Sequence, residues 1–389
     1  MQKKPVTPIW KNKKIIPIFL QLLFVLVIIT IGTFLIRSAL TGLNAIGIKV
    51  GFGFLNSTAS FAISDKLISY TPSDSYGRAL LVGLLNTVKV GVIGVIISGI
   101  IGTLIGIGRL SDNWLMRVLT KGYVEFVRNT PLLIQIFFLY FVVFLTLPKI
   151  ENNRNFLDMI FFSNRGVAIP WFTVNSSSII WLILMAASII MAVILWKIKL
   201  KKQIESGKNT YPFIWSTASI ILMAIAAYII TGTPPLGISI PRIEGMLFKG
   251  GYVVNIEFAS ILLGLIIYHS AFIAEIVRAG IIAVPKGQIE AAKALGLKKG
   301  TIMRLITLPQ ASRIIIPSAT SQFLNLFKNS TLAIAVGYTE LFSIGNTIIN
   351  QTGRAIEIMI LIASLFLILS LTISFFMNWF NKHYQLVER

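Results

Sequence analysis

The sequence predicts an all-α membrane protein with about eight transmembrane helices, and three observations support that prediction. Of the 389 residues, 55% are hydrophobic and only 13% are charged, which is about half the charged fraction of an ordinary soluble domain. The apolar residues gather in long runs with few charges. The net charge is +21, from 35 Lys and Arg against 14 Asp and Glu. A soluble chain this apolar would expose large patches to water, so the basic excess does not indicate nucleic-acid binding.

A helix needs about 20 mostly apolar residues to cross the hydrocarbon core, and eight stretches approach that length. They lie near Ile15–Ile36, Ala79–Ile107, Val118–Leu147, Ile179–Trp196, Pro212–Ile230, Ile256–Val284, Ile314–Val336 and Ile358–Phe380. The first is too long for a signal peptide and lacks a following small-x-small cleavage site. The third and seventh are interrupted by polar residues, and the third also contains Pro131. These two are therefore the least regular of the eight.

The distribution of basic residues orients the chain. With the N-terminus in the cytoplasm, cytoplasmic segments hold 21 of the 35 cations, external segments hold 10, and four lie inside spans. Because cytoplasmic loops are enriched in Lys and Arg, we expect both termini to be cytoplasmic. Outside, we expect Ser38–Arg78 to be irregular or a short amphipathic surface element, and Thr231–Asn255 to be rich in turns.

One cytoplasmic loop has a distinctive spacing, E-A-A-x3-G-x9-I-x-L-P. It consists of Glu290, Ala291, Ala292, Gly296, Ile306, Leu308 and Pro309. The small apolar residues predict a short, closely packable helix, and Gly296 suits a turn with positive φ. A second helix should follow and end at Pro309. Because such a loop has no membrane role of its own, we expect it to dock onto a partner.

This spacing resembles the signature of permease subunits of ATP-binding-cassette (ABC) importers. The wider sequence is similar to the polar-amino-acid permeases, through the segments Tyr123–Gln135, Phe272–Gly280, Lys286–Gln288 and Leu326–Leu332. The resemblance covers about Arg78–Leu147 and Gly251–Arg389. The sequence is most like the larger permeases of general L-amino-acid, or glutamate/glutamine/aspartate/asparagine, uptake systems.

The resemblance implies the fold of a type I importer, with a core of five helices. One N-terminal helix and an inserted helix pair are extra. The expected parts are residues 1–77, with the cytoplasmic N-terminal segment, the extra helix and an external loop, and residues 78–389, the permease domain. Within the latter, the inserted pair lies at about 178–231 and the coupling loop at 286–313. An inserted pair preserves the orientation that follows it, in agreement with the charge distribution.

The resemblance also implies the partners. These are a cytoplasmic ABC ATPase, a second permease subunit in a heterodimer, an external or periplasmic amino-acid-binding protein, the lipid bilayer and an amino-acid substrate. The expected location is the bacterial cytoplasmic (inner) membrane. ATP and Mg would be bound by the ATPase, so we expect no cofactor in this chain. The alternative function is an ion-gradient-driven secondary amino-acid transporter. A membrane enzyme and a sensor or channel that uses the loop only for docking are the other candidates.

Catalytic chemistry is not indicated by the sequence. The chain has no cysteine and two histidines, which leaves little for thiolate or histidine metal sites, and we expect no catalytic residue and no metal. The single Gly-Lys pair, Gly207-Lys208, is followed by Asn209 and not by Ser or Thr. A phosphate-binding loop of the G-x4-G-K-[S/T] type is therefore missing.

Charged residues within the membrane are costly, so each is a functional hypothesis. Glu125 and Arg128, and likewise Glu275 and Arg278, are three positions apart and should share a helix face. They are either structural ion pairs or parts of an inner gate.

Lys328 lies about 15 residues into the seventh span, which is roughly 20 Å from the inner interface. With Asn325, Asn329 and Ser330 it is a candidate for the translocation path, because an amino acid needs donors for its carboxylate. Alternatively, Lys328 extends to the outer interface or pairs with Glu340. Lys89 is expected to extend toward the outer face, and His269 to be a satisfied interior residue.

Overall fold

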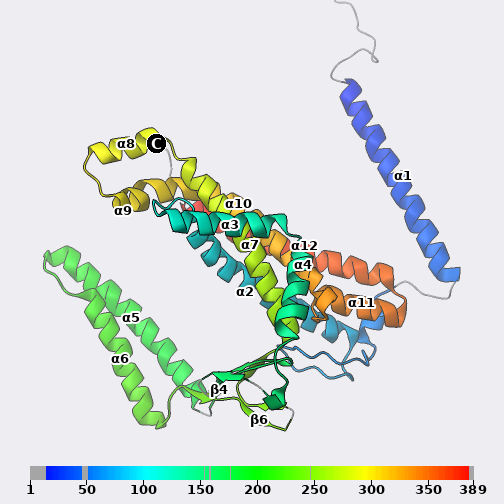
Figure 1. The fold of residues 1–389 in the computed structure, drawn as a ribbon, viewed down its shortest axis with the longest axis horizontal. Helices are drawn as coiled ribbons and strands as arrows, with labels where there is room; N and C mark the ends of the chain where they lie inside the picture. The colour runs from blue at the N-terminus through cyan, green and yellow to red at the C-terminus, as the bar shows by residue number, and fades with distance from the viewer. Residues whose placement is uncertain are drawn as a thin grey trace, which may run out of the picture. The chain divides into compact units, whose positions relative to one another are not determined.

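The computed structural model describes residues 15–45, 51–152, 154–156, 159–175, 177–245 and 247–384, most of which are helical (Figure 1). Six helices in these ranges are long and apolar enough to cross a membrane, and two bent pairs raise the number to eight if each is one span. The six are α1 (Ile15–Ala45), α2 (Tyr76–Gly108), α5 (Ser178–Ser206), α6 (Pro212–Thr231), α7 (Ile256–Ile282) and α12 (Ala355–Tyr384). The predicted helical membrane fold is confirmed, with six to eight candidate spans.

The predicted third span is broken in the structure. Helix α3 (Trp114–Asn129) meets the next helical segment, Leu132–Phe144, at 104°; that segment is α4 (Leu132–Phe137) and a π-helical continuation. The residue before a proline avoids the helical conformation, and Thr130 is extended. The Gln135 amide donates to the carbonyls of Val127 and Thr130, both at 3.0 Å, and fixes the break. The interruption predicted at Asn129–Pro131 is thus present, and it takes the form of a sharp bend between two helical segments.

The chain forms two compact units, which are described separately. The first comprises the described residues up to Lys89 and from Thr339 onward. Its core is buried between the start of α2, α11 (Leu341–Thr352) and α12. The side chains at its centre are all at most 2% exposed: Tyr70, Leu341, Ile344, Ile348 and Ile358.

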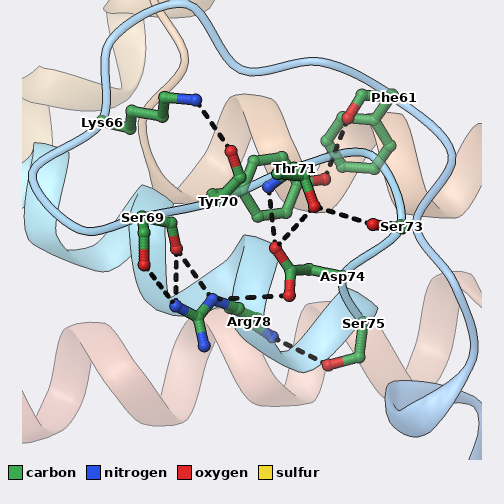
Figure 2. A network of polar contacts seen from close by, with 9 residues as sticks. All are labelled: Phe61, Lys66, Ser69, Tyr70, Thr71, Ser73, Asp74, Ser75 and Arg78. Carbon is green, nitrogen blue, oxygen red and sulfur yellow. Dashed lines mark hydrogen bonds and ion pairs between the residues drawn. The ribbon is translucent and has the colours of Figure 1, made fainter.

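The described parts of the stretch that was expected to be external, residues 38–45 and 51–78, are more ordered than expected. Helix α1 continues to Ala45, and the Thr41 hydroxyl donates to the carbonyl of Arg37 at 2.9 Å, the bond that lets threonine occupy a helix. Nearer to α2, Asp74 accepts from the Thr71 backbone N–H at 2.7 Å and Arg78 donates twice to the Ser69 carbonyl (Figure 2). The Thr71 N–H holds the pKa of the Asp74 carboxyl below its usual range.

Lys89 does not extend alone toward the outer face as predicted. Its ammonium lies 2.8 Å from the carboxylate of Asp65, and the two side chains are only 9% and 14% exposed. Asn86 donates to the Asp65 carbonyl at 2.7 Å. The segment before α2 thus folds back onto α2 and supplies the counter-charge that a buried ammonium requires.

The second unit, Val90–Tyr338, is built around α7. Helices α3, α4 and α10 (Leu308–Asn329) all pack on α7. Helix α2 approaches it through glycines: a Cβ at Gly102 would lie 2.7 Å from the carbonyl oxygen of Ser270, and one at Gly106 would lie 2.7 Å from that of Ala274. Small residues four apart allow two helix backbones to approach this closely. The two glycines therefore set the packing of α2 on α7.

Short strands flank the helix pair that was predicted to be an insertion, a feature that the sequence analysis missed. Four form an antiparallel sheet in the order β1 (Arg154–Phe156), β2 (Ile160–Ser163), β3 (Gly166–Ile169) and β8 (Tyr252–Val254). Two further antiparallel pairs are β4 (Trp171–Val174) with β5 (Leu236–Ser239), and β6 (Arg242–Glu244) with β7 (Leu247–Lys249). With three or four residues each, these strands are too short to show a clear alternating pattern. Much of the expected turn-rich segment is therefore sheet.

The inserted pair forms a helical hairpin, α5 and α6, whose main packing is internal. Ser188, Ala192, Ser216 and Ala227 are buried along its seam. The Ser216 hydroxyl donates to the Ala192 carbonyl at 3.0 Å. Small residues and one such bond are typical of helices that associate within a bilayer, while the outward apolar residues stay uncovered by this chain.

Candidate functional site

The E-A-A loop begins with a short helix that ends in a defined cap. Helix α8 spans Lys286–Ala294, and Gly296 has φ +75°. Gly296 N–H donates to the Lys293 carbonyl at 2.9 Å, and Leu297 N–H donates to the Ala292 carbonyl at 3.2 Å. These two bonds are those of a Schellman motif, in which the residue after the cap is left-handed. The predicted short helix and glycine turn are thus present.

One face of α8 is exposed and the opposite face is held by the protein. Glu290 and Ala291 are exposed, whereas Ala292 is 3% exposed. Leu295, at the end of α8, is 80% exposed. Gln310, in the first turn of α10, donates to Gln288 on α8. The helix therefore presents an acidic and apolar surface from a fixed position.

Pro309 does not end the second helix, contrary to the prediction. After α9 (Lys299–Ile302) the chain forms a π-helical segment, Met303–Thr307, and continues directly into α10, which begins at Leu308. Proline is tolerated in the first turn of a helix because its missing N–H needs no partner there. Ile306, Leu308 and Pro309 are half-buried along this segment. They anchor the exit of the loop onto α10.

Of the two predicted ion pairs, the structure contains one and not the other. Glu275 and Arg278 do pair, with the Arg278 guanidinium 2.5 Å and 3.2 Å from one carboxylate oxygen. The second oxygen of Glu275 pairs with Arg109 at the end of α2. The three side chains are only 12–32% exposed. The charge-assisted hydrogen bond from Arg109 therefore links the end of α2 to α7, whereas the bonds from Arg278 stay within α7; hydrogen bonds between charged groups are the stronger class.

Glu125 and Arg128 do not form the predicted pair. Glu125 lies 3.7 Å from Lys121, one turn earlier, and both side chains are about 60% exposed. The Arg128 guanidinium lies over the ring of Phe272 on α7, 5.1 Å from its centroid. A cation over an aromatic face gains electrostatic stabilisation without a carboxylate. Arg128 thus fastens α3 to α7 by a contact that sequence spacing does not reveal.

An ion pair between the E-A-A loop and the turn after α2 is almost fully exposed. Lys299 lies 2.8 Å from Asp112 in the turn between α2 and α3, and their side chains are 85% and 90% exposed. The hydrogen bond from Lys299 lowers the pKa of the Asp112 carboxyl. Exposed pairs contribute little free energy. The buried Arg109–Glu275 pair therefore stabilises the end of α2 more than the exposed Asp112–Lys299 pair does.

The candidate path residues divide into an exposed and a buried group. Asn325 and Lys328 are exposed near the C-terminal end of α10, three positions apart on one face. Ser330 is buried and donates to the Phe327 carbonyl at 2.7 Å, so its hydroxyl is engaged by the backbone. Asn329 is half-buried, with its amide nitrogen 3.2 Å from Nε2 of His269.

His269 and Arg109 are positioning residues that the sequence analysis did not place in the site. His269 on α7 is 1% exposed and orients Asn329 on α10. Arg109 directly follows the apolar run of α2, and its position beside Glu275 depends on the packing of α2 on α7. A charge at the end of an apolar run was the only signal available for Arg109.

The fold and loop together define a multi-pass membrane protein in which the capped helix α8 lies between α7 and α10, as expected of a transporter subunit. Residues 209–385 match the family model described as "Binding-protein-dependent transport system inner membrane component". The chain is 42% identical over 372 residues to YhdX of Escherichia coli K12, an amino-acid ABC transporter permease by name, covering 95% of this chain and 94% of that protein.

Two further relatives also extend over almost the whole chain. The general L-amino acid transport system permease protein AapQ of Rhizobium johnstonii is 42% identical, covering 96% of this chain and 93% of that protein. The glutamate/glutamine/aspartate/asparagine transport system permease protein BztB of Rhodobacter capsulatus is 37% identical, covering 96% and 94%. The chain belongs to the family of amino-acid ABC transporter permeases.

Membership of this family establishes the general activity. The protein is the permease subunit of an ABC amino-acid importer and a multi-pass protein of the inner membrane. ATP hydrolysis resides in a partner ATPase, which binds the nucleotide, and an amino-acid-binding protein is the other implied partner. The expected absence of catalysis and of a cofactor in this chain agrees with that assignment.

Proposed function

We propose that the exposed face of α8, with Glu290 and Ala291 at its centre, is the surface on which the partner ATPase docks. The observation that supports this is the rigid presentation of α8 by the Gly296 cap and the Gln288–Gln310 bond. Ala292 lies on the inward face and lets α8 pack closely. A helix held at both ends transmits a displacement instead of absorbing it.

From α8, the displacement passes through the half-buried Ile306–Pro309 exit into α10, which packs on α7. Glu275 couples α7 to the end of α2 through Arg109. The ion pairs of Glu275 thus act as a structural latch at one end of the helix bundle. Packed helices of this kind switch between discrete arrangements, which suits alternation between inward- and outward-facing states.

Asn325, Lys328 and Asn329 would contact the substrate. A free amino acid carries a carboxylate, for which the Lys328 ammonium and the two amides are donors. His269 holds Asn329 in place, and Ser330 shapes the end of α10 through its bond to the backbone. The exposed face of α10 would meet a second, related permease, so the path would lie between the two subunits of a heterodimer. The substrates would be L-amino acids, as named for AapQ and BztB.

Both termini and the α8 loop would lie in the cytoplasm, which follows from the excess of basic residues there. The binding protein would then deliver substrate on the side of the β-strands. ATP turnover in the partner, and not an ion gradient, would drive uptake.

Site-directed cross-linking tests the docking surface, and the absence of native cysteine in the chain makes every introduced thiol unique. In the assembled importer, Ala291→Cys should cross-link to a single cysteine on the ATPase. Lys208→Cys, equally exposed in the α5–α6 turn, is the control and should not. Failure of Ala291→Cys to cross-link in complexes that still transport would contradict the docking surface.

Lys328→Gln tests the path. We expect normal assembly but about tenfold slower uptake at low substrate concentration, which corresponds to about 1.4 kcal/mol of lost interaction. Lys121→Gln removes an exposed lysine from α3 and should leave uptake unchanged. Unchanged affinity and rate in Lys328→Gln would show that Lys328 does not line the path.

A further inference from the structure

The C-terminal end of α5 and the connection to α6, together called the α5–α6 turn below, carry a cluster of five lysines that the transport cycle proposed above does not use. They are Lys197, Lys199, Lys201, Lys202 and Lys208, with Glu205 as the single acid among them. Glu205 lies 3.8 Å from Lys201, with both side chains more than 60% exposed. Such a pair is weak, so the cluster keeps most of its positive charge.

An aromatic side chain contacts one of the lysines, and aromatic residues flank the cluster. The Lys199 ammonium lies 4.3 Å from the centroid of the Trp215 ring, and the Thr210 hydroxyl donates to the Lys199 carbonyl at 2.6 Å. The rings of Trp196 and Phe213 meet edge to face across the hairpin at 6.4 Å. Trp196 and Trp215 are 40% and 52% exposed. Exposed tryptophans of this kind are enriched at the level of the lipid headgroups.

The length of the hairpin places the lysines at the same level. Helix α6 has 20 residues, which at 1.5 Å per residue is about 30 Å, the thickness of the hydrocarbon core. Lys197 follows the start of α5 at Ser178 by nearly as many residues, or roughly 29 Å. Lys199, Lys201 and Lys202 lie within the next two turns. The cluster therefore begins where the hydrocarbon ends.

Exposed aliphatic side chains alternate with the lysines. Ile198, Leu200 and Ile204 are 57%, 40% and 75% exposed. A soluble phosphate would gain nothing from them, and an acidic protein surface would have to desolvate its charges against them. A phospholipid offers both an anionic headgroup and acyl chains. We infer that the α5–α6 turn is a binding site for anionic phospholipid, with the lysines on the phosphate and Ile198 and Leu200, within one turn of the hydrocarbon edge, against the first carbons of the acyl chains.

The inference is independent of the proposed coupling and path residues, none of which lies in the hairpin. Each basic residue at a membrane surface contributes about 1 kcal/mol of attraction to anionic lipid, which is about a fivefold enrichment. Neutral lipid should show no enrichment, and salt should weaken the effect.

Energy transfer to labelled lipid provides the test. The assembled importer carries a donor dye on Ser206→Cys, beside the cluster, in nanodiscs of phosphatidylcholine with a small fraction of acceptor-labelled phosphatidylglycerol or acceptor-labelled phosphatidylcholine. We expect several-fold greater local enrichment of phosphatidylglycerol. The matched control is Val174→Cys, 78% exposed in β4 at the opposite end of the hairpin, where the two acceptors should give equal transfer.

Charge variants then identify the cause. Replacing Lys197, Lys199, Lys201 and Lys202 by Gln should abolish the difference between the two lipids, whereas replacing them by Arg should keep it. If the Gln variant does not assemble, raising the salt concentration with the unmodified cluster should reduce the enrichment. Equal transfer from Ser206→Cys to both lipids, or enrichment that survives the Gln substitutions, would overturn the inference. Loss of the enrichment on adding inorganic phosphate at constant ionic strength would indicate a soluble-phosphate site and would overturn it too.

Discussion

Helix α7 and the α5–α6 hairpin are both apolar enough to cross a membrane, yet they are stabilised differently. In α7, 61% of the most apolar window is buried inside the protein, against 17% in α5 and 11% in α6. Helices α3, α4 and α10 pack on α7, while α5 and α6 pack mainly on each other. Hydropathy does not distinguish the two regions. The position of small and charged residues does.

The polar residues show the same contrast. Those on α7 face other helices: Glu275 meets Arg109, and His269 meets Asn329. The charged residues of the hairpin gather instead where α5 ends and the turn to α6 begins, and its buried Ser188 and Ser216 donate only to backbone carbonyls of the hairpin itself. Polar groups within a bundle cost free energy unless they are paired. The difference indicates that α7 is stabilised by contacts within the unit, whereas the hairpin is covered by this chain only along its own seam.

The largest expected effect is at the contact between α2 and α7. Gly102→Leu would place a side chain where even a Cβ lies 2.7 Å from both the Ser270 carbonyl and the Ile273 side chain. Overpacking a tight contact costs about 1–3 kcal/mol or more, and a backbone oxygen cannot move aside. We expect severe loss of folded protein, measured by fluorescence-detected size exclusion and thermal melting.

Gly99→Leu is the matched control, one turn away on the same helix. A Cβ at Gly99 meets only the ring of Phe323, at 3.7 Å, an ordinary contact. It should fold nearly as well as the unsubstituted protein. Equal folding of both variants would mean that α2 does not depend on α7 in the way described.

The next effect is at Glu275. Glu275→Gln removes the charge that Arg109 and Arg278 share and leaves two half-buried arginines close together. Hydrogen bonds to charged groups contribute about 1.5–3 kcal/mol each. We expect uptake to fall by roughly tenfold or more, with ATP hydrolysis less affected, measured in proteoliposomes.

Glu125→Gln is the control for that change. Glu125 pairs with Lys121 at the surface, where the two charged groups are 3.7 Å apart and both side chains are exposed. Such a pair is weak, so uptake should stay within about twofold of that of the unsubstituted importer. If Glu125→Gln were as harmful as Glu275→Gln, burial would not be what separates the two pairs.

These two pairs also show how far the sequence predicts the structure. Both have the same i, i+3 spacing, and spacing alone predicts two equal pairs. Residue spacing does not show that Arg109 lies beside Glu275, because 166 residues separate them. Likewise, the preference of Thr130 for extended backbone before Pro131 explains the break in α3, but not its angle of 104°.

Other features were predictable because they are local. The Gly296 turn follows from a helix that must end with positive φ, and the α5–α6 pair follows from two apolar runs separated by a basic turn. The strands were missed because pairs such as β3 with β8 join residues more than 80 positions apart. Pro309 was misplaced because a π-helical segment lets the chain enter α10 without stopping.

Deleting the α5–α6 hairpin should reduce uptake less than Gly102→Leu or Glu275→Gln. Val174 and Leu236 face each other in the antiparallel β4–β5 pair, so Asn175–Pro235 can be replaced by Asn-Gly, which closes a two-residue turn. We expect the importer to assemble, with uptake within about threefold in neutral lipid, since no more than ~0.6 kcal/mol is then lost. Loss of assembly would show that the hairpin contacts another subunit and is not merely held by lipid.

The smallest effect is expected at Lys299→Gln. The Asp112–Lys299 pair is short but almost fully exposed. Because water and salt screen such pairs, the uptake rate should change by less than about twofold and the melting temperature should stay nearly the same.

The pKa of Asp112 is lowered chiefly by the hydrogen bond from Lys299. A lowered carboxyl pKa stabilises the pair above the ordinary value of about 3.9, and this contribution is lost as the pH falls through the lowered value. Between pH 5 and 8 the pair therefore stays ionised. The uptake profiles of Lys299→Gln and the unsubstituted importer should run parallel over that range, and a divergence there would mean that Asp112 is buried in the assembled complex.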